Sequence, residues 1–336
     1  MKAHLQLDSV DKFYGPIDIG VHAVQNISME VNKGEIIALL GSSGCGKTST
    51  LRMVAGFEEV SRGKITLAGR EVQTLPPARR NVAMAFEGYS LYPTVTLREN
   101  IAFALKAAKL LDTEVASRVK HVSDMLEITD ILDRYPMSVS GGQQQRASLA
   151  RALIRDADLH LLTEANSLAD RIAVMDDGIV QQYAAPQEIK DAPANLFTGT
   201  FVGEPPMNVF PVKAKEAGGQ LRLDLYDGLY LEYAADAFAP DVRSALLARA
   251  DMMLGVRPYA VHRSSDGAAA QVIANQWLGD QSHIAASFAG GTLVLVEHDR
   301  ADLAVGDTIK VRLMPDDLHF FDTDTGAAIS HGGQLA

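Results

Sequence analysis

The chain has 336 residues, of which 47% are hydrophobic and 22% charged, and its formal net charge is −11. This length allows two domains, and the acidic balance argues against a general nucleic-acid-binding protein. The single cysteine excludes an internal disulfide, and no apolar run approaches the roughly 20 residues that a membrane helix needs. Residues 1–10 lack the apolar core of a signal peptide, so we expect a cytoplasmic location.

The first 200 residues predict alternating strands and helices. Predicted strands, from period-two alternation or short apolar runs, are 4–10, 27–31, 35–40, 81–86 and 159–162. Predicted helices are 47–55, 97–110, 113–126 and 141–154. The sequence Asp176-Asp177-Gly178 predicts a hairpin between strands at 172–175 and 179–183.

The pattern changes near residues 203–207. Beyond them come short alternating segments separated by turns rich in glycine and aspartate. They are 221–225, 229–233, 253–256, 271–277, 283–288, 292–297 and 308–313. This spacing predicts a small β-barrel, with Trp277 and the pair Met252 and Met253 in its core.

A glycine-rich segment between a predicted strand and a predicted helix carries the first functional signal. Its nine candidate nucleotide-binding residues are Gly41, Ser42, Ser43, Gly44, Cys45, Gly46, Lys47, Thr48 and Ser49. Glycines there let backbone N–H groups converge on phosphate oxygens. Lys47 is placed to reach the β- and γ-phosphates, and the Thr48 hydroxyl is placed to bind Mg²⁺. We call residues 41–48 the phosphate loop. Arg79 and Arg80 are expected to be solvated charges.

A second anion site opens the predicted helix 141–154. It consists of Ser140, Gly141, Gly142 and Gln143, which we call the signature motif. A helix N-terminus favours an anion, yet the phosphate loop already accounts for the nucleotide's own phosphates. The motif therefore implies that one chain's site is completed by another chain.

With both motifs in place, the chain resembles the ATP-binding subunit of an ABC importer of the maltose or glycerol-3-phosphate type. Other stretches that carry the resemblance are Tyr14, 168–178, 203–208, 255–258 and 318–322. The resemblance implies an α/β P-loop NTPase (ABC ATPase) domain over residues 1–205, followed by an all-β, OB-like TOBE domain over residues 206–336. It covers nearly the whole chain.

The resemblance also implies roles and partners. Tyr14 stacks on adenine, and the signature motif binds the γ-phosphate of ATP held on the opposite subunit. Two subunits, identical or close paralogues, then enclose two ATP with Mg²⁺. Transmembrane permease subunits hold the dimer at the cytoplasmic face of the membrane, and an extracytoplasmic solute-binding protein delivers a carbohydrate, polyol or glycerol-phosphate-like solute. No nucleic-acid partner is implied.

Glu87 is a first departure from the family pattern. The family has glutamine at this position, where it contacts Mg²⁺ and the attacking water. A glutamate oxygen can also bind Mg²⁺, so Glu87 is a candidate metal ligand and catalytic residue. It adds a negative charge beside ATP unless a proton or the metal neutralises it.

The second departure is larger. After Leu162 the family continues with an acidic pair, a helix, a strand and a histidine that senses the γ-phosphate, but here Thr163 and Glu164 follow directly. Glu164 aligns either with the catalytic glutamate or with a later stretch that ends at Gly178. We favour the later stretch because that match continues without a gap, which leaves Glu164 a doubtful catalytic residue. His160 is expected to be a strand residue and not the sensor.

Loss of a core strand is expected to open the sheet and expose apolar residues. Three explanations stay open: residues absent from this sequence but present in the protein, an in-frame deletion, or a natural protein that binds ATP without hydrolysing it. The alternative function is accordingly a hydrolysis-deficient ATP-binding or regulatory module.

Overall fold

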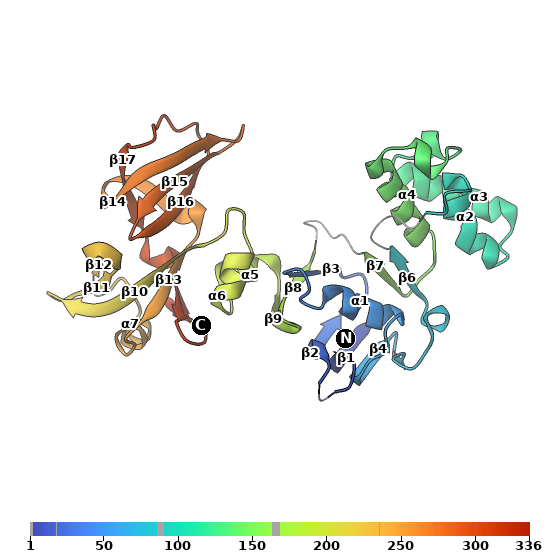
Figure 1. The fold of residues 1–336 in the computed structure, drawn as a ribbon, viewed down its shortest axis with the longest axis horizontal. Coiled ribbons are helices and arrows are strands. Elements are labelled where there is room, and N and C mark those ends of the chain that lie inside the picture. The colour runs from blue at the N-terminus through green and yellow to red at the C-terminus, as the bar shows by residue number, and fades with distance from the viewer. Residues whose placement is uncertain (1–2, 18, 86–90, 163–168, 235) are drawn as a thin grey trace. The chain divides into compact units, whose positions relative to one another are not determined.

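The computed structural model describes residues 3–17, 19–85, 91–162, 169–234 and 236–336. The chain divides into two compact units, Met1–Val180 and Gln181–Ala336, which are described separately (Figure 1).

An antiparallel sheet of order β2-β1-β4-β5 begins the first unit. Its strands are β1 (Leu5–Tyr14), β2 (Val21–Val31), β4 (Arg62–Leu67) and β5 (Arg70–Glu71). Alternate residues of β1, including Leu5 and Leu7, are buried, as the period-two pattern predicts. Both predicted strands in this region are confirmed, although each extends further than the apolar pattern that signals it.

The parallel strands form two separate sheets. In the first, of order β3-β8-β9, β3 (Ile37–Gly41) pairs in parallel with β8 (Arg171–Asp176), and β9 (Ile179–Ala184) completes the predicted hairpin. Asp177 and Gly178, with φ of 44° and 79°, make its turn. In the second sheet, β6 (Val82–Ala85) pairs in parallel with β7 (Leu159–Leu162).

β3 and β7 are therefore both edge strands. Within the described ranges no strand pairs with the free side of either. The Leu162 side chain, at the end of β7, is 37% exposed. The expected opening of the sheet is confirmed.

Four longer helices complete the first unit. They are α1 (Lys47–Ala55), α2 (Leu97–Ala107), α3 (Asp112–Met125) and α4 (Gly141–Leu153). Short 3₁₀ turns lie at Pro77–Arg79, Thr129–Ile131 and Pro136–Ser138. α2, α3 and α4 share a core that includes Ile101, Val119 and Ala150. The predicted helices are confirmed, and α1 has the predicted bounds.

Arg80 corrects an expectation from the sequence. Its side chain is buried, and its guanidinium donates to the carbonyls of Met53, Val54, Gln73 and Leu75 at 2.5–3.1 Å. Two of these carbonyls lie in the last turn of α1, whose unpaired carbonyls attract cations. Burial lowers the pKa of the Arg80 guanidinium. Arg80 thus fixes the C-terminal end of α1, whereas Arg79 is exposed.

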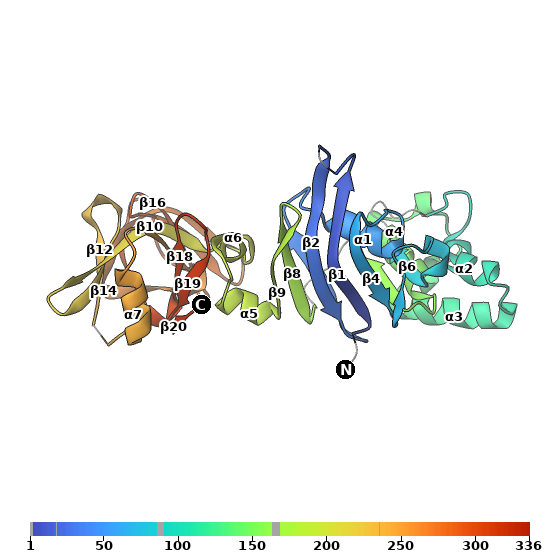
Figure 2. The ribbon, with the colours of Figure 1, turned by 90° about the horizontal axis from the view of Figure 1, so that it is seen from below.

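The second unit contains two sheets around one core (Figures 1 and 2). The larger has the order β12-β11-β10-β13-β18-β19-β20 and the smaller the order β16-β15-β14-β17. Their bounds are β10 (Asn208–Ala217), β11 (Gln220–Asp224), β12 (Tyr230–Ala234), β13 (Met252–Val256), β14 (Val261–Trp277), β15 (Ser282–Phe288), β16 (Gly291–Glu297), β17 (Thr308–Leu313), β18 (Leu318–Asp322), β19 (Ala328–His331) and β20 (Gln334–Leu335).

Helices α5 (Pro186–Asp191), α6 (Leu196–Phe201) and α7 (Pro240–Leu247) also belong to this unit. Further 3₁₀ turns are Tyr226–Gly228, Pro258–Ala260 and Pro315–Asp317. The core includes Phe210, Phe288 and Phe320. Met252 lies in it as predicted, whereas Met253 is half-buried and not part of it. Trp277 is 39% exposed because it ends β14 beyond the core, so its predicted place is wrong.

Candidate functional site

The phosphate loop connects the end of β3 to the start of α1, and two glycines allow its path. A Cβ atom at Gly41 (φ 155°) would lie 2.1 Å from the Met175 carbonyl oxygen. One at Gly46 (φ 98°) would lie 2.5 Å from the Ala23 carbonyl oxygen. Both contacts are impossible for a side chain, so glycine is required at both positions. The loop therefore packs directly against β8 and β2.

Lys47 lies with its ammonium group over the loop. Nζ donates to the carbonyl oxygens of Gly41 and Ser42, each at 2.8 Å, and lies 3.4 Å from the Cys45 sulfur. The Cys45 side chain is buried. A cation held at this place by two neutral carbonyls can exchange them for phosphate oxygens, which are stronger partners.

The N-terminus of α1 adds a second source of positive charge. The N–H groups of Lys47, Thr48 and Ser49 lie in its first turn, where no acceptor exists within the helix. The N-cap Gly46 provides no side-chain cap, and the first turn has no acidic residue. The helix dipole is thus left uncompensated at the loop and favours an anion.

Polar side chains around the loop are placed for a bound nucleotide. Thr48, the candidate Mg²⁺ ligand, is exposed. Ser42 Oγ donates to Asp176 Oδ1 at 3.3 Å, which brings a carboxylate from the end of β8 to the loop. Asp176 was not predicted as a site residue, and its only sequence signal is its place at the carboxyl end of a parallel strand.

Tyr14 ends β1 beside the first turn of α1. Its hydroxyl lies 3.1 Å from Ser49 Oγ, the Lys12 ammonium lies 4.9 Å from the centre of its ring, and its side chain is 41% exposed. The aromatic face of Tyr14 therefore lies next to the end of α1 that would hold phosphates.

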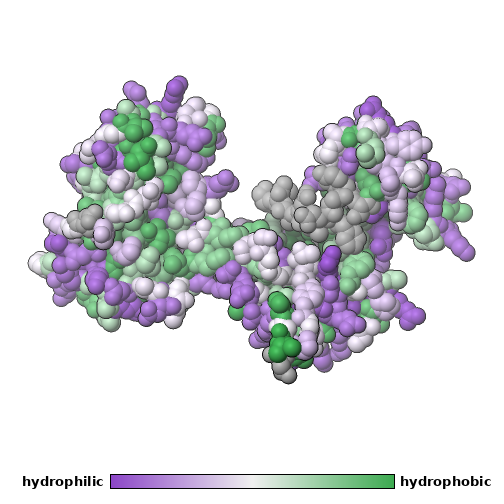
Figure 3. Space-filling model, in the orientation of Figure 1, coloured by the Kyte–Doolittle hydropathy of each residue, from purple (hydrophilic) through white to green (hydrophobic). Residues whose placement is uncertain are grey.

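The tip of the β1–β2 hairpin that follows Tyr14 carries exposed Ile19 and Val21, and an apolar patch covers this tip (Figure 3).

The signature motif opens α4 with a capping box. Ser140 Oγ accepts from the Gln143 N–H at 3.4 Å, and Gln143 Oε1 accepts from the Ser140 N–H at 3.0 Å. Ser140, Gly141 and Gly142 are exposed, and a Cβ atom at Gly142 would meet no atom within 4 Å. Among the residues that the structure describes, no neighbour of Gly142 requires a glycine there.

The structure places the two motifs on different parts of the first unit. α4 packs against α2, α3, β6 and β7, whereas α1 packs against β2, β3 and β6. His160 lies on β7 opposite Ala83, as predicted for a strand residue. Glu87 and Glu164 lie outside the described residues. Among the residues described, no cluster of three His, Cys, Asp or Glu side chains could hold a metal ion.

Comparisons with known proteins identify both units. Residues 24–167 match the family model described as ABC transporter, and residues 254–321 match the model described as TOBE domain. The chain is 35% identical to the sn-glycerol-3-phosphate import ATP-binding protein UgpC of Cereibacter sphaeroides, over 96% of this chain and 99% of that protein. The chain belongs to the ATP-binding proteins of ABC transporters. The predicted family and fold class of this ABC ATPase are confirmed.

Two further similarities were found. The trehalose import ATP-binding protein SugC of Mycobacterium tuberculosis is 36% identical over 76% of this ABC ATPase and 72% of SugC. A solved dimeric structure of the ATP-binding cassette MJ0796 bound to ADP and Pi has a TM-score of 0.49 and 21% identity, and it covers 54% of this chain and 98% of the cassette.

The alignment with UgpC bears on the second departure from the family pattern. It extends over 365 positions, whereas the ABC ATPase has 336 residues. UgpC therefore contains residues that have no counterpart in this chain, which agrees with the predicted loss of a segment.

In the part of the chain that the structure describes, no helix is long and apolar enough to cross a membrane.

Proposed function

We propose that the chain is the ATP-binding subunit of an importer for a carbohydrate, polyol or glycerol-phosphate-like solute. The observation that carries the proposal is the phosphate loop, where the Lys47 ammonium and the uncompensated N-terminus of α1 converge. The glycerol-3-phosphate and trehalose importers to which UgpC and SugC belong support the class of solute.

Each candidate residue has a role in this proposal. Tyr14 stacks on the adenine, the N–H groups of the phosphate loop hold the phosphates, and Lys47 binds the β- and γ-phosphates. The exposed Thr48 hydroxyl fits a Mg²⁺ ion, which takes oxygen ligands and retains several waters. The ion would neutralise phosphate charge, and Glu87 would be a further ligand.

The signature motif would act on a second subunit. Its exposed glycines and helix N-terminus support a head-to-tail dimer, identical or between close paralogues, in which Ser140 and Gly142 face the γ-phosphate of ATP on the opposite phosphate loop. On binding, Gln143 would exchange its capping-box bond for contacts across the interface.

An exposed aromatic pair supports docking of permease subunits. Tyr92 and Phe103 are 46% and 54% exposed, with ring centroids 5.1 Å apart. Such a pair, of which Tyr92 follows Glu87 by five positions in the sequence, suits a partner helix at the cytoplasmic face of the membrane. The solute-binding protein would act through the permease and would not touch this chain.

Binding of a fluorescent ATP analogue tests the proposal. Lys47→Ala should weaken binding about 10- to 100-fold because two charge-assisted phosphate contacts are lost. Lys33→Ala, which removes an exposed lysine, should bind like the parent. Equal binding by Lys47→Ala and the parent would refute the site. Uptake of labelled glycerol-3-phosphate and trehalose by a strain lacking the gene tests the solute.

The split parallel sheet favours a second candidate, an ATP-binding module without hydrolysis. β7 and β3, which the family joins through a further strand, are both free edges here. A Lys47-dependent release of phosphate at rates typical of importers would eliminate this candidate. Binding of ATP without turnover would establish it.

A further inference from the structure

The two sheets of the second unit, here called the C-terminal unit, meet along two seams, and different side-chain hydrogen bonds bridge each seam. At the first seam, the Asn208 side chain on β10 donates to the Val294 carbonyl oxygen at 2.8 Å and accepts from the Val294 N–H at 2.7 Å. This pair of bonds replaces the pair that a neighbouring strand would make to β16. At the second seam, edge strand β12 faces edge strand β17, and the Tyr233 hydroxyl crosses it to donate to the Leu313 carbonyl oxygen at 2.9 Å.

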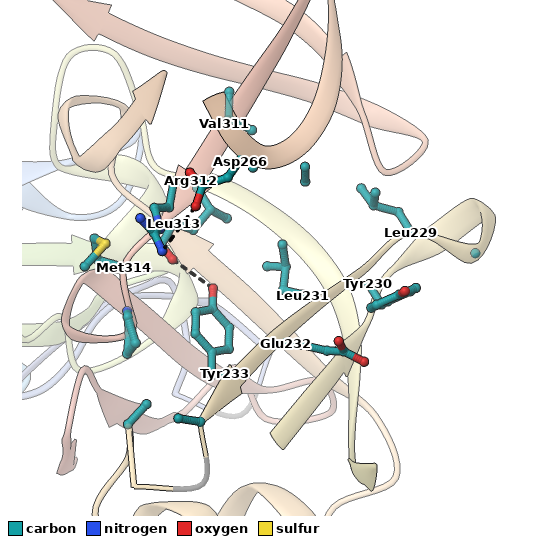
Figure 4. Close-up of a pocket in the computed structure, with 16 residues that line it drawn as sticks. Leu229, Tyr230, Leu231, Glu232, Tyr233, Asp266, Val311, Arg312, Leu313 and Met314 are labelled. Atoms are coloured by element: carbon teal, nitrogen blue, oxygen red, sulfur yellow. Dashed lines mark hydrogen bonds and ion pairs between the residues drawn. The ribbon is translucent and has the colours of Figure 1, made fainter. Parts of the chain in front are cut away.

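A cavity of about 600 Å³ lies in this second seam (Figure 4). We call it the slot. Its lining includes the accessible apolar residues Leu229 and Met314, the buried core residues Leu231, Val311 and Leu313, and the polar residues Glu232, Asp266 and Arg312. It is widened where β14 leaves the register of β17 between Arg263 and Ala268. The volume lies in the range of binding sites, and the lining suits alternating apolar side chains.

The edge of β12 that faces away from β11 borders the slot and carries backbone N–H and C=O groups. The Leu225 N–H donates to the Leu229 carbonyl at 2.8 Å, which fixes the alternation of the ladder between β11 and β12. By that alternation, the backbone groups of Tyr230 and Glu232 point away from β11, whereas the Ala234 carbonyl accepts from the Ala237 N–H at 3.0 Å. Among the described residues, no strand pairs with this edge. It is a template with the spacing of a β-strand.

Charge decides which strand fits. β12 is five residues long with Glu232 at its centre, so antiparallel pairing of two copies would place Glu232 opposite itself. Like charges directly opposite each other destabilise a sheet. A partner strand with a lysine or arginine at its centre would instead face Glu232 favourably. Glu232 lies 3.9 Å from the half-buried Arg222 in a long ion pair, and the Glu232 side chain stays 37% exposed.

We propose that the slot is a docking site for an extended segment of a partner protein that pairs with β12 as an added strand. The segment carries a basic residue opposite Glu232 and places apolar side chains against Leu229 and Met314. Main-chain hydrogen bonds supply affinity in this mode of recognition, and the apolar pocket supplies selectivity. This interaction is independent of ATP binding.

A blocked, labelled peptide of sequence Thr-Val-Lys-Val-Thr is the probe, and its anisotropy is measured with the full chain. Glu232→Pro removes the outward N–H but no bond to β11, so binding should weaken about tenfold. Glu232→Gln retains the N–H and should weaken binding only about two- to threefold. The same peptide, N-methylated at the nitrogens that face β12, tests the same bonds without altering the protein and should not bind.

Two results would overturn the proposal. If the N-methylated peptide binds as well as the parent peptide, the slot is an apolar ligand site and not a strand template. If the chain without peptide self-associates and Glu232→Pro abolishes this, the edge is an interface between copies.

Discussion

The two units differ in how the gaps between their sheets are closed. In the C-terminal unit, strands joined mostly by short hairpins surround one core, and each gap is bridged by a side chain such as Asn208 or Tyr233. In the N-terminal unit, β3 and β7 stand as two free edges. A parallel sheet depends on strands distant in sequence, so one lost segment opens its middle, whereas an antiparallel barrel is built from neighbours.

The largest effect is expected from adding, after Leu162, the segment that the family resemblance predicts there. Insertion after Leu162 of the corresponding residues of UgpC should join β3 and β7 and raise ATP hydrolysis about 100-fold or more, because a general base is regained. The same insert with its catalytic glutamate changed to glutamine should restore stability but not hydrolysis. No gain from either insert would show that the open sheet is not what limits the N-terminal unit.

A core truncation in the C-terminal unit should affect that unit alone. Phe320 is fully buried, so Phe320→Ala should lower the free energy of unfolding by about 3–5 kcal/mol. The single tryptophan, Trp277, reports this unit by fluorescence, and the circular dichroism of α1 to α4 reports the other. Leu335→Ala, at an exposed site, is the control. A parallel shift of both transitions would mean that the units do not unfold separately.

The matching test in the N-terminal unit uses two adjacent arginines. Arg80→Ala should destabilise this unit by about 2–4 kcal/mol, because it removes the side-chain donor of the Val54, Gln73 and Leu75 carbonyls and one of the two donors of the Met53 carbonyl. Arg79→Ala should change the free energy by less than about 0.5 kcal/mol because Arg79 is exposed. Equal effects, read from the helical circular dichroism in urea, would refute the capping role of Arg80.

A pH-dependent effect is expected in the C-terminal unit. His319 Nδ1 lies 2.9 Å from His331 Nδ1, and burial lowers the pKa of His319 to about 3. Between pH 6.5 and pH 3 the unfolded chain binds a proton that the folded unit does not. Stability should therefore fall as pH drops below 6.5, by about 1.4 kcal/mol per pH unit for this group. In urea titrations, His319→Phe should flatten this dependence, and the exposed His298→Gln should not.

Local patterns predict much of the fold, and long-range contacts explain the failures. The bounds of α1 and β7 follow from strong local periodicity. β10 was missed because Pro211 argues against a central strand. The structure tolerates this proline because residues 208–212 pair only with β13, and β11 pairs with residues 213–217 instead.

The candidate site likewise has a part that local sequence patterns predict and a part that depends on long-range contacts. The phosphate loop and the signature motif are each contiguous, so the sequence contains them whole. The bond from Ser42 to Asp176 joins residues 134 positions apart, and the burial of Arg80 depends on α1. No local pattern records such contacts. The sequence does contain a signal for α7, although no helix is predicted there. Val242 and Leu246 are apolar, are buried, and have the spacing of one helix face.

Gly142 is not required for the stability of a single chain, but the proposed dimer requires it. An added methyl group there meets nothing, and alanine is the better helix former by about 0.5–1 kcal/mol. Selection for thermal resistance alone would therefore discard this glycine. In the proposed dimer, the methyl group would stand between the signature motif and the γ-phosphate. A subunit with Gly142→Ala would then be more stable by itself but would inactivate the ATP site that it shares with a normal subunit. A stabilising substitution would thus act as a dominant inhibitor.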